Sequence, residues 1–551
     1  MPTIEASKKD LEKLIGKKFT DNQLEDALMY VKGEVDGKDG DAIKIDVKET
    51  NRPDLWSSEG IAREIKARIG KDKGIKKYKT TKGKVKVYVD KNLAKVRPLI
   101  ACAVVKNVKI DDDFIIQMVQ LQEKVGETFG RKRKETGIGL YDFDIMHPPI
   151  HYKGFKDNQI EFVPLEWKVP MRPSEILKQH EKGKAYAHLL EGNTYYPIVI
   201  DSKKVVASMP PIINSQVTGK VTAQTKNLFI EVTGFNWNIV STALEVMCMA
   251  LADRGGKIET TEINFPIGKT YPSKKVNTPE FKTQKLTFKT ELFNQVTGLG
   301  IKPTELKTLL EKARYKVSMT KEKTSVEYSN YRQDIMHGVD VVEDALISYG
   351  YDKIEPVPVE MCVFGKSLAE LDALEEVRDG CIGMGLQEIT SFNLTSKTNQ
   401  EAKMLLKGEK FVELANPMSS NYEIMRKRLL PQALNFLSKN KNQIFPQRIF
   451  EVGACLELNP KADIGVNQTN HICGVVTHSN ANFTEIKSIL VTLCDMLGLK
   501  LKIEKKTFSF LGENSAKITV GGKKGFIGEL SEEVEKNFGL KKPVALFEFE
   551  L

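Results

Sequence analysis

The sequence predicts a multidomain α+β protein, and three observations support this class. The chain has 551 residues, which is enough for roughly three to five domains. Its hydrophobic content of 41% and charged content of 28% are typical of soluble globular proteins. Stretches with strand-like alternation and stretches with helical spacing are mixed along the chain without a regular βαβ order, which favours α+β over a doubly wound α/β fold.

Charge, cysteine usage and apolar segments indicate which partners and which cellular compartment to expect. The net charge of +10 arises from 83 lysines and arginines against 73 acidic residues, an excess that permits an RNA partner without requiring one. The seven cysteines are scattered and form no C-x-x-C pair, which argues against a zinc or disulfide framework. No segment approaches 18 uninterrupted apolar residues, and the N-terminus lacks a secretory apolar core. We therefore expect a cytoplasmic protein with no membrane partner.

Residues 1–82 are predicted to form an N-terminal α/β module. Residues 4–15 have the spacing of a short helix, whose candidate core positions are Ile4, Leu11, Leu14 and Ile15. Residues 42–48 alternate as a strand, and Ser57 is a suitable N-cap for the helix that follows. Residues 70–84 are rich in lysine and glycine and are interpreted as a linker or exposed arm.

Residues 83–268 are predicted to form a second, mixed domain. A strand at 85–89 is followed by an amphipathic helix at 113–129 that ends at Gly130. The next four residues, Arg131 to Lys134, are all basic and form a candidate contact for nucleic-acid phosphates. The alternative is a solvated loop, which is the commoner use of such a charge run.

Residues 269–352 are predicted to form a small winged-helix-like domain. Two short helices are expected at 290–296 and 303–315, and Pro303 suits the first turn of the second. Strand-like pieces at 316–319 and 325–328 complete a two-helix module with a hairpin. Such a module serves protein contacts as readily as nucleic-acid contacts.

Four acidic residues stand close together near the end of this domain: Asp334, Asp340, Glu343 and Asp344. A helix over about 336–349 would place the last three on one face, beside an apolar stripe of Val339, Val342 and Leu346. Asp334 can join them only from a position before the first helical turn. Crowded carboxylates suit a hard divalent ion such as Mg²⁺, whereas the alternative is a solvated acidic face near the helix N-terminus.

Residues 353–551 are predicted to form a C-terminal domain with a substantial antiparallel sheet. A helix is expected at 367–380, and strands are expected at 471–478 and 545–551. No Walker loop and no G-x-G-x-x-G in a Rossmann context occurs in the chain.

Four stretches carry a family resemblance: NRPDLWSSEGIAREI, GRKRKETGIGLYDFD, YRQDIMHGVDVVEDALISYGYD and ANPMSSNYEIMRKRLLPQALNFLSKN. Together they resemble the phenylalanine–tRNA ligase beta-subunit family in its archaeal and eukaryotic form, in the expected order over nearly the whole chain. The resemblance implies four domains: a B1-like domain at 1–82, a B3/B4-like editing domain at 83–268, a B5 domain at 269–352 and a degenerate class II synthetase-like domain at 353–551.

In this family an alpha subunit holds the ATP-dependent ligation site. The resemblance therefore implies two partners: the alpha subunit, in an α2β2 tetramer, and tRNA(Phe). The chain has no arginine after Arg448, and lysines lack the bidentate fork that grips ATP phosphates. This favours a scaffold over a free-standing ligase, which is the alternative. A scaffold needs an interface, and four apolar residues are candidates for it or for an internal core: Leu429, Leu430, Leu434 and Phe436.

The resemblance also implies a site that hydrolyses mischarged Tyr-tRNA(Phe), because a hydrophobic pocket rejects an added hydroxyl by only about 10²-fold. The matching positions are Val199, Ser208, Asn214, Glu231 and Thr233. Glu231 would accept a hydrogen bond from the phenol, a contact that phenylalanine cannot make. The alternatives are that these are ordinary strand residues and that the chain is an assembly subunit without editing activity. For the acidic cluster, the resemblance implies a structural Mg²⁺ at Asp334, Asp340, Glu343 and Asp344.

Overall fold

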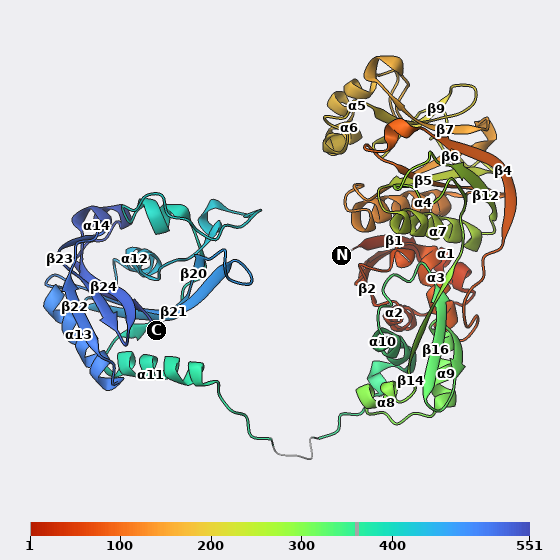
Figure 1. Ribbon diagram of the computed structural model, residues 1–551. Helices are drawn as coiled ribbons and strands as arrows, with labels where there is room; N and C mark the ends of the chain where they lie inside the picture. Colours follow the sequence, from red (N-terminus) through yellow and green to blue (C-terminus); the bar gives the residue numbers. More distant parts are fainter. Residues whose placement is uncertain (1, 359–362) are drawn as a thin grey trace. The chain divides into compact units, whose positions relative to one another are not determined.

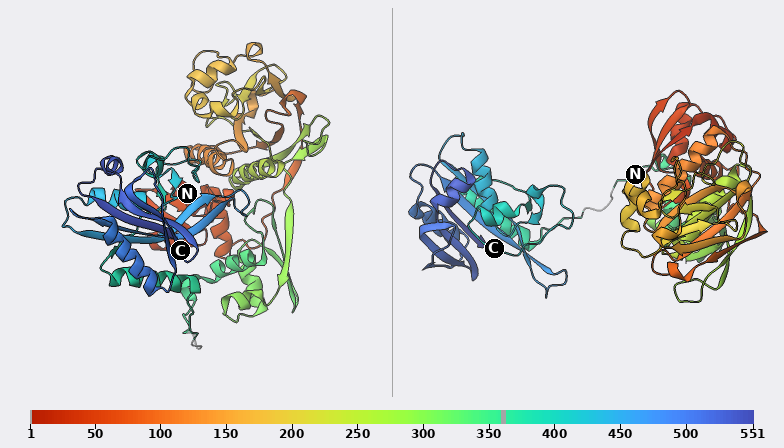
Figure 2. Two further views of the ribbon diagram at one scale, coloured as in Figure 1. Left: turned by 60° about the vertical axis from the view of Figure 1, so that its left-hand side comes forward. Right: turned by 90° about the horizontal axis from the view of Figure 1, so that it is seen from above.

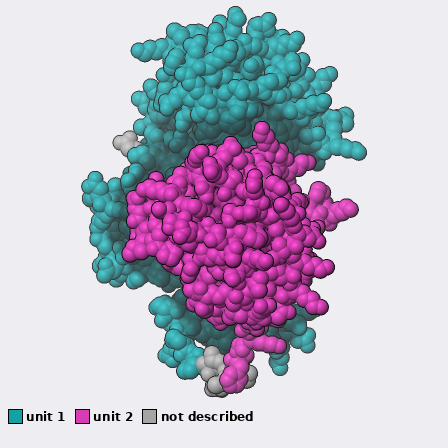
Figure 3. Space-filling model, turned by 90° about the vertical axis from the view of Figure 1, so that its left-hand side faces the viewer, with its two compact units in different colours: residues 1–358 teal, residues 359–551 magenta. Residues whose placement is uncertain are grey.

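The chain folds into two compact units, residues 1–358 and 359–551 (Figure 1, Figure 3). The computed structural model describes residues 2–358 and 363–551. Both units combine strands and helices, so the predicted multidomain α+β class is confirmed. Within the described residues, every helix is too short or too polar to cross a bilayer.

The N-terminal part of unit 1 is a three-stranded antiparallel sheet with helices against it, in strand order β1-β3-β2. Its elements are β1 (Thr3–Ser7), α1 (Lys8–Ile15), α2 (Asp21–Met29), β2 (Gly33–Asp39), β3 (Ala42–Val47) and α3 (Ser58–Arg68). The predicted helix at 4–15 is therefore wrong over its first turn. Ile4 is buried as expected, but it lies in β1 opposite Ile45, and Ser7 caps the helix that follows. Ser57 caps α3 as predicted.

The next part of unit 1 is a ten-stranded mixed sheet in the order β10-β9-β8-β7-β4-β12-β5-β11-β6, with β13 paired to β12. The strands are β4 (Thr80–Val89), β5 (Leu99–Lys106), β6 (Thr136–Asp142), β7 (Ile150–Phe155), β8 (Tyr196–Ile200), β9 (Val206–Met209), β10 (Ile213–Asn214), β11 (Leu228–Gly234), β12 (Lys257–Asn264) and β13 (Lys275–Thr278). The helices are α4 (Asp112–Lys124), α5 (Pro173–Gln179), α6 (Glu181–Tyr186) and α7 (Trp237–Asp253). The apolar helix α7 packs on β5 and β11.

Strand β4 begins inside the segment that was expected to be a linker. Residues 80–82 pair in parallel with β12, so the expected linker ends five residues earlier than the sequence suggested. The predicted boundary between residues 82 and 83 consequently falls within a strand. One hydrophobic core contains residues from Ile4 to Phe265, because the N-terminal elements β1 and α3 pack against α4 and α7.

The last part of unit 1 is a small helical module with a three-stranded sheet of order β14-β16-β15. Its elements are β14 (Thr283–Lys289), α8 (Leu292–Thr297), α9 (Pro303–Lys312), β15 (Lys316–Met319), β16 (Lys323–Ser329) and α10 (Gly338–Tyr349). It has a separate apolar core built around Phe293, Leu310 and Val326. This agrees with the predicted two helices and hairpin.

Unit 2 is a seven-stranded sheet with helices on both faces (Figure 1, Figure 2). The strand order is β17-β20-β21-β25-β24-β23-β22, antiparallel apart from the β17–β20 pair. The strands are β17 (Gln387–Glu388), β20 (Gln447–Leu458), β21 (Val466–Thr477), β22 (Leu501–Lys505), β23 (Leu511–Val520), β24 (Lys523–Leu530) and β25 (Val544–Glu550), beside a small pair, β18 (Leu394–Thr395) and β19 (Ile424–Met425). The helices are α11 (Ala369–Gly383), α12 (Leu430–Lys439), α13 (Phe483–Met496) and α14 (Glu532–Phe538).

The two faces of this sheet have separate cores. Helices α11 and α13 pack on one face, and α12 and α14 pack on the other. The four apolar residues considered for an interface belong to the second core: Leu429, Leu430 and Leu434 are fully buried, and Phe436 is half-buried. Their use is therefore internal.

Candidate functional site

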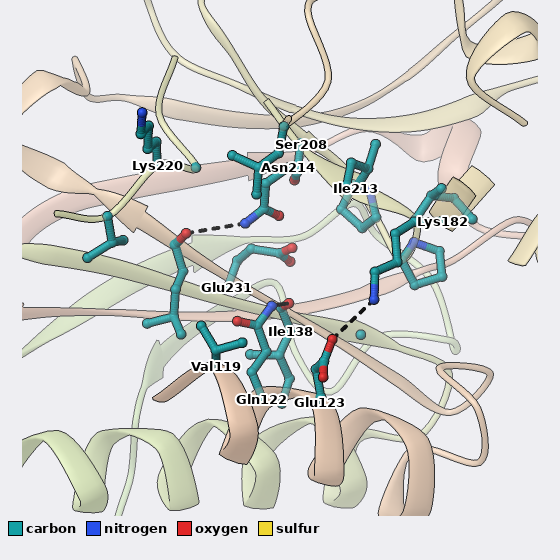
Figure 4. A pocket seen from close by; sticks show the side chains of 18 of the residues that line it. Val119, Gln122, Glu123, Ile138, Lys182, Ser208, Ile213, Asn214, Lys220 and Glu231 are labelled. Carbon is teal, nitrogen blue, oxygen red and sulfur yellow. Dashed lines mark hydrogen bonds and ion pairs between the residues drawn. The ribbon is translucent and has the colours of Figure 1, made fainter. Parts of the chain in front are cut away.

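A cavity of about 660 Å³ lies in the large sheet domain, between α4 and the strands β6, β9, β10 and β11. This volume is within the usual range for small-ligand pockets. Much of its wall is apolar, from residues that include Phe114, Met118, Val119, Ile138, Leu140, Ile213 and Leu228. Figure 4 shows Ser208 and Asn214 on one side of the cavity, α4 side chains on the other, and Glu231 between them.

Three of the five predicted editing residues line this cavity: Ser208, Asn214 and Glu231. Ser208 and Asn214 are brought together because they are paired residues on the neighbouring strands β9 and β10. The Asn214 side-chain amide donates to the Leu140 carbonyl at 3.3 Å. Glu231 comes from β11. No spacing along the sequence predicts that it lies near Ser208 and Asn214.

The structure does not place Val199 or Thr233 on the wall of the cavity. Both are fully buried. The Thr233 hydroxyl accepts a hydrogen bond of 2.9 Å from the Arg97 side chain, whose guanidinium also donates to the Thr233 carbonyl at 2.6 Å. Val199 lies opposite Ser208 in the ladder of β8 and β9. Their editing roles stay predictions from the resemblance, and their observed contacts are those of structural residues.

Glu231 has an unusual electrostatic environment. Its side chain is buried, and burial raises the pKa of the carboxyl to about 8, so the group is neutral at physiological pH. Oε1 lies 3.0 Å from the Tyr141 hydroxyl, which in turn lies 2.7 Å from the Ser208 hydroxyl. Oε2 has no hydrogen-bond partner among the described residues. A buried polar atom without a partner is costly unless a ligand supplies one.

Sequence reasoning missed Tyr141, although strand alternation contains the signal. Gly137, Gly139 and Tyr141 lie on the same face of β6, opposite Thr233, Glu231 and Phe229 of β11. A Cβ at Gly139 would sit 2.0 Å from the Tyr141 hydroxyl and 2.9 Å from Glu231 Oε1. Glycine at this position therefore leaves the space in which the two side chains meet.

The basic run Arg131 to Lys134 lies next to this cavity. Arg133 lines the cavity, stacks on the Tyr186 ring at 4.3 Å and donates to the backbone carbonyls of Pro211 and Ile212. The other three members are exposed and bear the charge toward solvent. The run thus combines one structural arginine with three cations available to an anionic partner. Its RNA-binding role stays a prediction.

The acidic cluster lies around the start of α10. Asp334 precedes the helix, as the geometry required, and Gly350 ends it. The helix begins at Gly338 rather than about residue 336, and its buried side differs from the predicted stripe. Val339 is 50% exposed, whereas Val341, Val342 and Ala345 are buried. The face with Val341, Val342 and Ala345 is buried because it packs in the core of the small module. Helix α3 contacts α10 on another side.

Two of the four carboxylates are already neutralised by arginines. Asp344 is buried and accepts hydrogen bonds from Arg68 at 2.8 Å, from Arg332 at 2.6 Å and from the Tyr315 hydroxyl at 2.7 Å. Burial opposes ionisation, but Arg332 and Arg68 outweigh it and hold the pKa of Asp344 well below its ordinary value. Asp334 forms a two-pronged pair with Arg332.

The other two carboxylates also have protein partners. Asp340 accepts hydrogen bonds from the backbone N–H groups of Met336 and His337 at the helix N-terminus, and Glu343 pairs with Lys32 at 2.8 Å. All four carboxylates border one cavity of about 270 Å³, but Arg52, Arg68 and Arg332 border it too. In this arrangement the residues do not fit Mg²⁺, because cationic side chains occupy the places that a cation would take. The metal role of the cluster stays a prediction.

The last part of the C-terminal domain was expected not to bind ATP phosphates, because it has lysines but no arginine after Arg448. Lys523 and Lys524 begin β24 just after a two-glycine turn, and Lys523 pairs with Glu550 at 2.6 Å.

Comparisons with known proteins agree with this architecture. The profile of the "Phenylalanyl tRNA synthetase beta chain CLM domain" matches residues 356–551, and that of the "tRNA synthetase B5 domain" matches residues 286–351. The chain is 42% identical to the phenylalanine–tRNA ligase beta subunit of Pyrococcus furiosus, over all of this chain and 99% of that protein. The chain belongs to the phenylalanine–tRNA ligase beta-subunit family.

Other members of the family support this assignment. The beta subunit of Pyrococcus horikoshii is 41% identical over all of this chain and 98% of its own length. A crystal structure of an N-terminal fragment of the beta subunit from Pyrococcus horikoshii is similar with a TM-score of 0.61 and 44% identity, covering 64% of this chain and all of the fragment. The family resemblance expected from the sequence is therefore confirmed.

Proposed function

We propose that the chain works as the beta subunit of a phenylalanine–tRNA ligase whose alpha subunit attaches phenylalanine to tRNA(Phe) with ATP and Mg²⁺. The relatives that match over their full length carry this name. The lack of arginine after Arg448 and the pairing of Lys523 with Glu550 support a ligation site outside this chain. We infer an α2β2 heterotetramer in which unit 2 is a scaffold.

We further propose that the cavity between α4 and the large sheet hydrolyses Tyr-tRNA(Phe). The observation that carries this proposal is the buried carboxyl of Glu231, which borders a largely apolar cavity and has one oxygen without a partner among the described residues. A tyrosyl phenol can pair with that oxygen, whereas phenylalanine leaves it unsatisfied. Sites built to bond a substrate hydroxyl reject the analogue that lacks it by about 10⁴- to 10⁵-fold.

The hydrolytic step in this proposal is direct attack by water. Water adds to the ester carbonyl carbon, the bond from that carbon to the ribose oxygen breaks, and free tyrosine and tRNA leave. Ser208 and Asn214 are the polar side chains placed to orient water or the ribose end. His180 also borders the cavity, but its ring contacts the Leu165 carbonyl and the Lys182 N–H, so it is not free to act as the base.

Deacylation of Tyr-tRNA(Phe) by the assembled enzyme tests the editing proposal. Glu231→Ala is expected to lower kcat/KM for Tyr-tRNA(Phe) hydrolysis by about 10²-fold or more, because the phenol loses its buried partner. Attachment of phenylalanine should stay at the wild-type rate, since that site belongs to the alpha subunit.

The matched control is Glu123→Ala, which removes an exposed carboxylate at the edge of the same cavity, where it pairs with Lys182 at 3.1 Å. This variant should hydrolyse Tyr-tRNA(Phe) like the wild type. If Glu231→Ala also does so, the cavity is not the editing site. If the wild-type enzyme itself fails to hydrolyse Tyr-tRNA(Phe), the chain is an assembly subunit without editing activity.

A further inference from the structure

Three potential metal ligands converge on the sheet of unit 2. Cys455 of β20, His471 of β21 and Glu548 of β25 come from three neighbouring strands. The Cys455 sulfur, a ring nitrogen of His471 and a carboxylate oxygen of Glu548 all lie within 4.8 Å of one another. Among the described residues, this is the one group of three or more such side chains that meets this spacing.

The positions of two of the three side chains are fixed by other contacts. The Glu548 carboxylate accepts hydrogen bonds from the Leu429 N–H at 3.0 Å and the Leu430 N–H at 2.9 Å, at the start of α12. His471 Nδ1 lies 3.2 Å from Glu548 Oε1, and its Nε2 lies 3.1 Å from the Thr469 hydroxyl. The imidazole is thus held at both nitrogens. With a metal at Nδ1, the Nε2–H would still bond Thr469, and such a bond at the other nitrogen is common for metal-binding histidines.

The ligand types of this group favour Zn²⁺, and its burial leaves one side open to solvent. Cys455 and Glu548 are 1% exposed, while the His471 side chain is 20% exposed and leaves a path to solvent. A thiolate, an imidazole and a carboxylate are a ligand set of mixed softness that suits Zn²⁺ and does not suit Mg²⁺ or Ca²⁺. Three protein ligands leave a fourth position for water on the open side.

We propose that Cys455, His471 and Glu548 bind a Zn²⁺ that ties three strands of unit 2 to the start of α12. His471 binds through Nδ1, and its Nε2–H then donates to Thr469. Binding displaces the thiol proton of Cys455 to solvent, and Glu548 keeps its two backbone hydrogen bonds through its remaining lone pairs. The sequence argued against zinc because the cysteines have no metal-binding spacing; strand pairing assembles the ligands instead.

The competing explanation is an ion pair between His471 and Glu548 that caps α12, beside a core cysteine. That explanation accounts for Glu548 and His471 but needs no sulfur next to them. Metal analysis of the full chain, purified together with its alpha partner, separates the two. We expect about one zinc per beta chain to remain after dialysis against a weak chelator.

Single substitutions then assign the zinc to this site. Cys455→Ser and His471→Gln should each lower the bound zinc at least tenfold. Cys494→Ser and His478→Gln are matched controls, because Cys494 is buried in the other core of unit 2 and His478 pairs with Glu485. Both controls should retain the wild-type zinc content.

Cobalt gives a readout that does not depend on how well a variant folds. The wild-type protein loaded with Co²⁺ should show a thiolate-to-cobalt charge-transfer band in the near ultraviolet. Zinc below one tenth per chain together with no such band overturns the proposal, and so does zinc that survives both Cys455→Ser and His471→Gln. Neither result bears on hydrolysis of Tyr-tRNA(Phe), which belongs to unit 1.

Discussion

Asp344→Asn is expected to destabilise unit 1 by about 3–5 kcal/mol, the usual cost of removing one partner from a buried ion pair. Asp344 faces Arg68 and Arg332, which are 2% and 3% exposed. Asparagine keeps the shape of the side chain but removes its charge. Arg68 keeps Glu64 and Arg332 keeps Asp334, but both lose the buried carboxylate that they share. Urea unfolding of the full chain, followed by tryptophan fluorescence, measures this loss. Trp56, Trp167 and Trp237 are the only tryptophans in the sequence, so the signal reports on unit 1 alone.

Glu343→Gln is the matched control for this measurement. Glu343 is the preceding residue, but its side chain is half-exposed, and its pair with Lys32 is expected to contribute about 1 kcal/mol or less. A double-mutant cycle of Asp344→Asn with Arg68→Met should show a coupling energy of about 1–3 kcal/mol. A loss for Asp344→Asn no greater than that for Glu343→Gln would show that the buried pairs contribute little.

The same fluorescence measurement tests the metal site predicted from the sequence. Because Arg68, Arg332 and Lys32 already pair with three of the carboxylates, we expect EDTA and Mg²⁺ to leave the unfolding midpoint unchanged. A midpoint that rises with Mg²⁺ in the wild type, and not in Glu343→Gln, would show that the ion displaces these cations. The resemblance-based assignment would then be right.

Glu231→Gln is expected to change how the stability of unit 1 depends on pH. The Glu231 carboxyl binds its proton up to a pKa of about 8 in the folded protein, because it is buried, whereas the unfolded chain releases it near 4.5. Between these values the folded state holds one more proton than the unfolded state. Wild-type stability therefore falls as pH rises through this window, by about 1.4 kcal/mol per pH unit from this group. Glutamine carries no such proton and removes this slope.

Unfolding free energies of the two proteins at pH 5, 6, 7 and 8 should thus diverge, with the variant gaining about 4 kcal/mol on the wild type over the range. Ser208→Ala is the matched control. It removes the other neighbour of the Tyr141 hydroxyl but no titrating group, so its curve should run parallel to that of the wild type. Parallel curves for Glu231→Gln as well would mean that Glu231 is ionised in the folded protein.

Local sequence patterns predicted several elements correctly. The alternation of residues 42–47 produces β3 with Ile43, Ile45 and Val47 buried, and Ser57 caps α3. These features depend on near neighbours along the chain, so a period or a cap is enough to identify them. The prediction of a helix at 4–15 was wrong over its first turn because it rested on a local period alone. Ile4 fits a helical period, but its pairing with Ile45 of β3 decides that it lies in a strand.

Side-chain partners far apart in sequence were beyond these patterns. Asp344 meets Arg68 from 276 positions away, so a residue predicted to bind a metal also belongs to a buried ion pair. Tyr141 meets Glu231 across two strands, and Cys455 meets His471 and Glu548 across three. Each of these contacts follows from strand order or domain packing. Alternation within β6 places Gly139 and Tyr141 on one face, but it does not show that Glu231 of β11 lies beside them.

The sequence by itself determined the α+β class, the family and the acidic, polar and apolar residues available to each site, because composition, period and motif are local properties. It also required Asp334 to precede α10. The tertiary structure alone decided that Ser208, Asn214 and Glu231 share one cavity, that Val199 and Thr233 do not line it, and that arginines pair with two of the four acidic residues. Charge and burial depend on what surrounds a group in space, and only the packed fold brings those surroundings together.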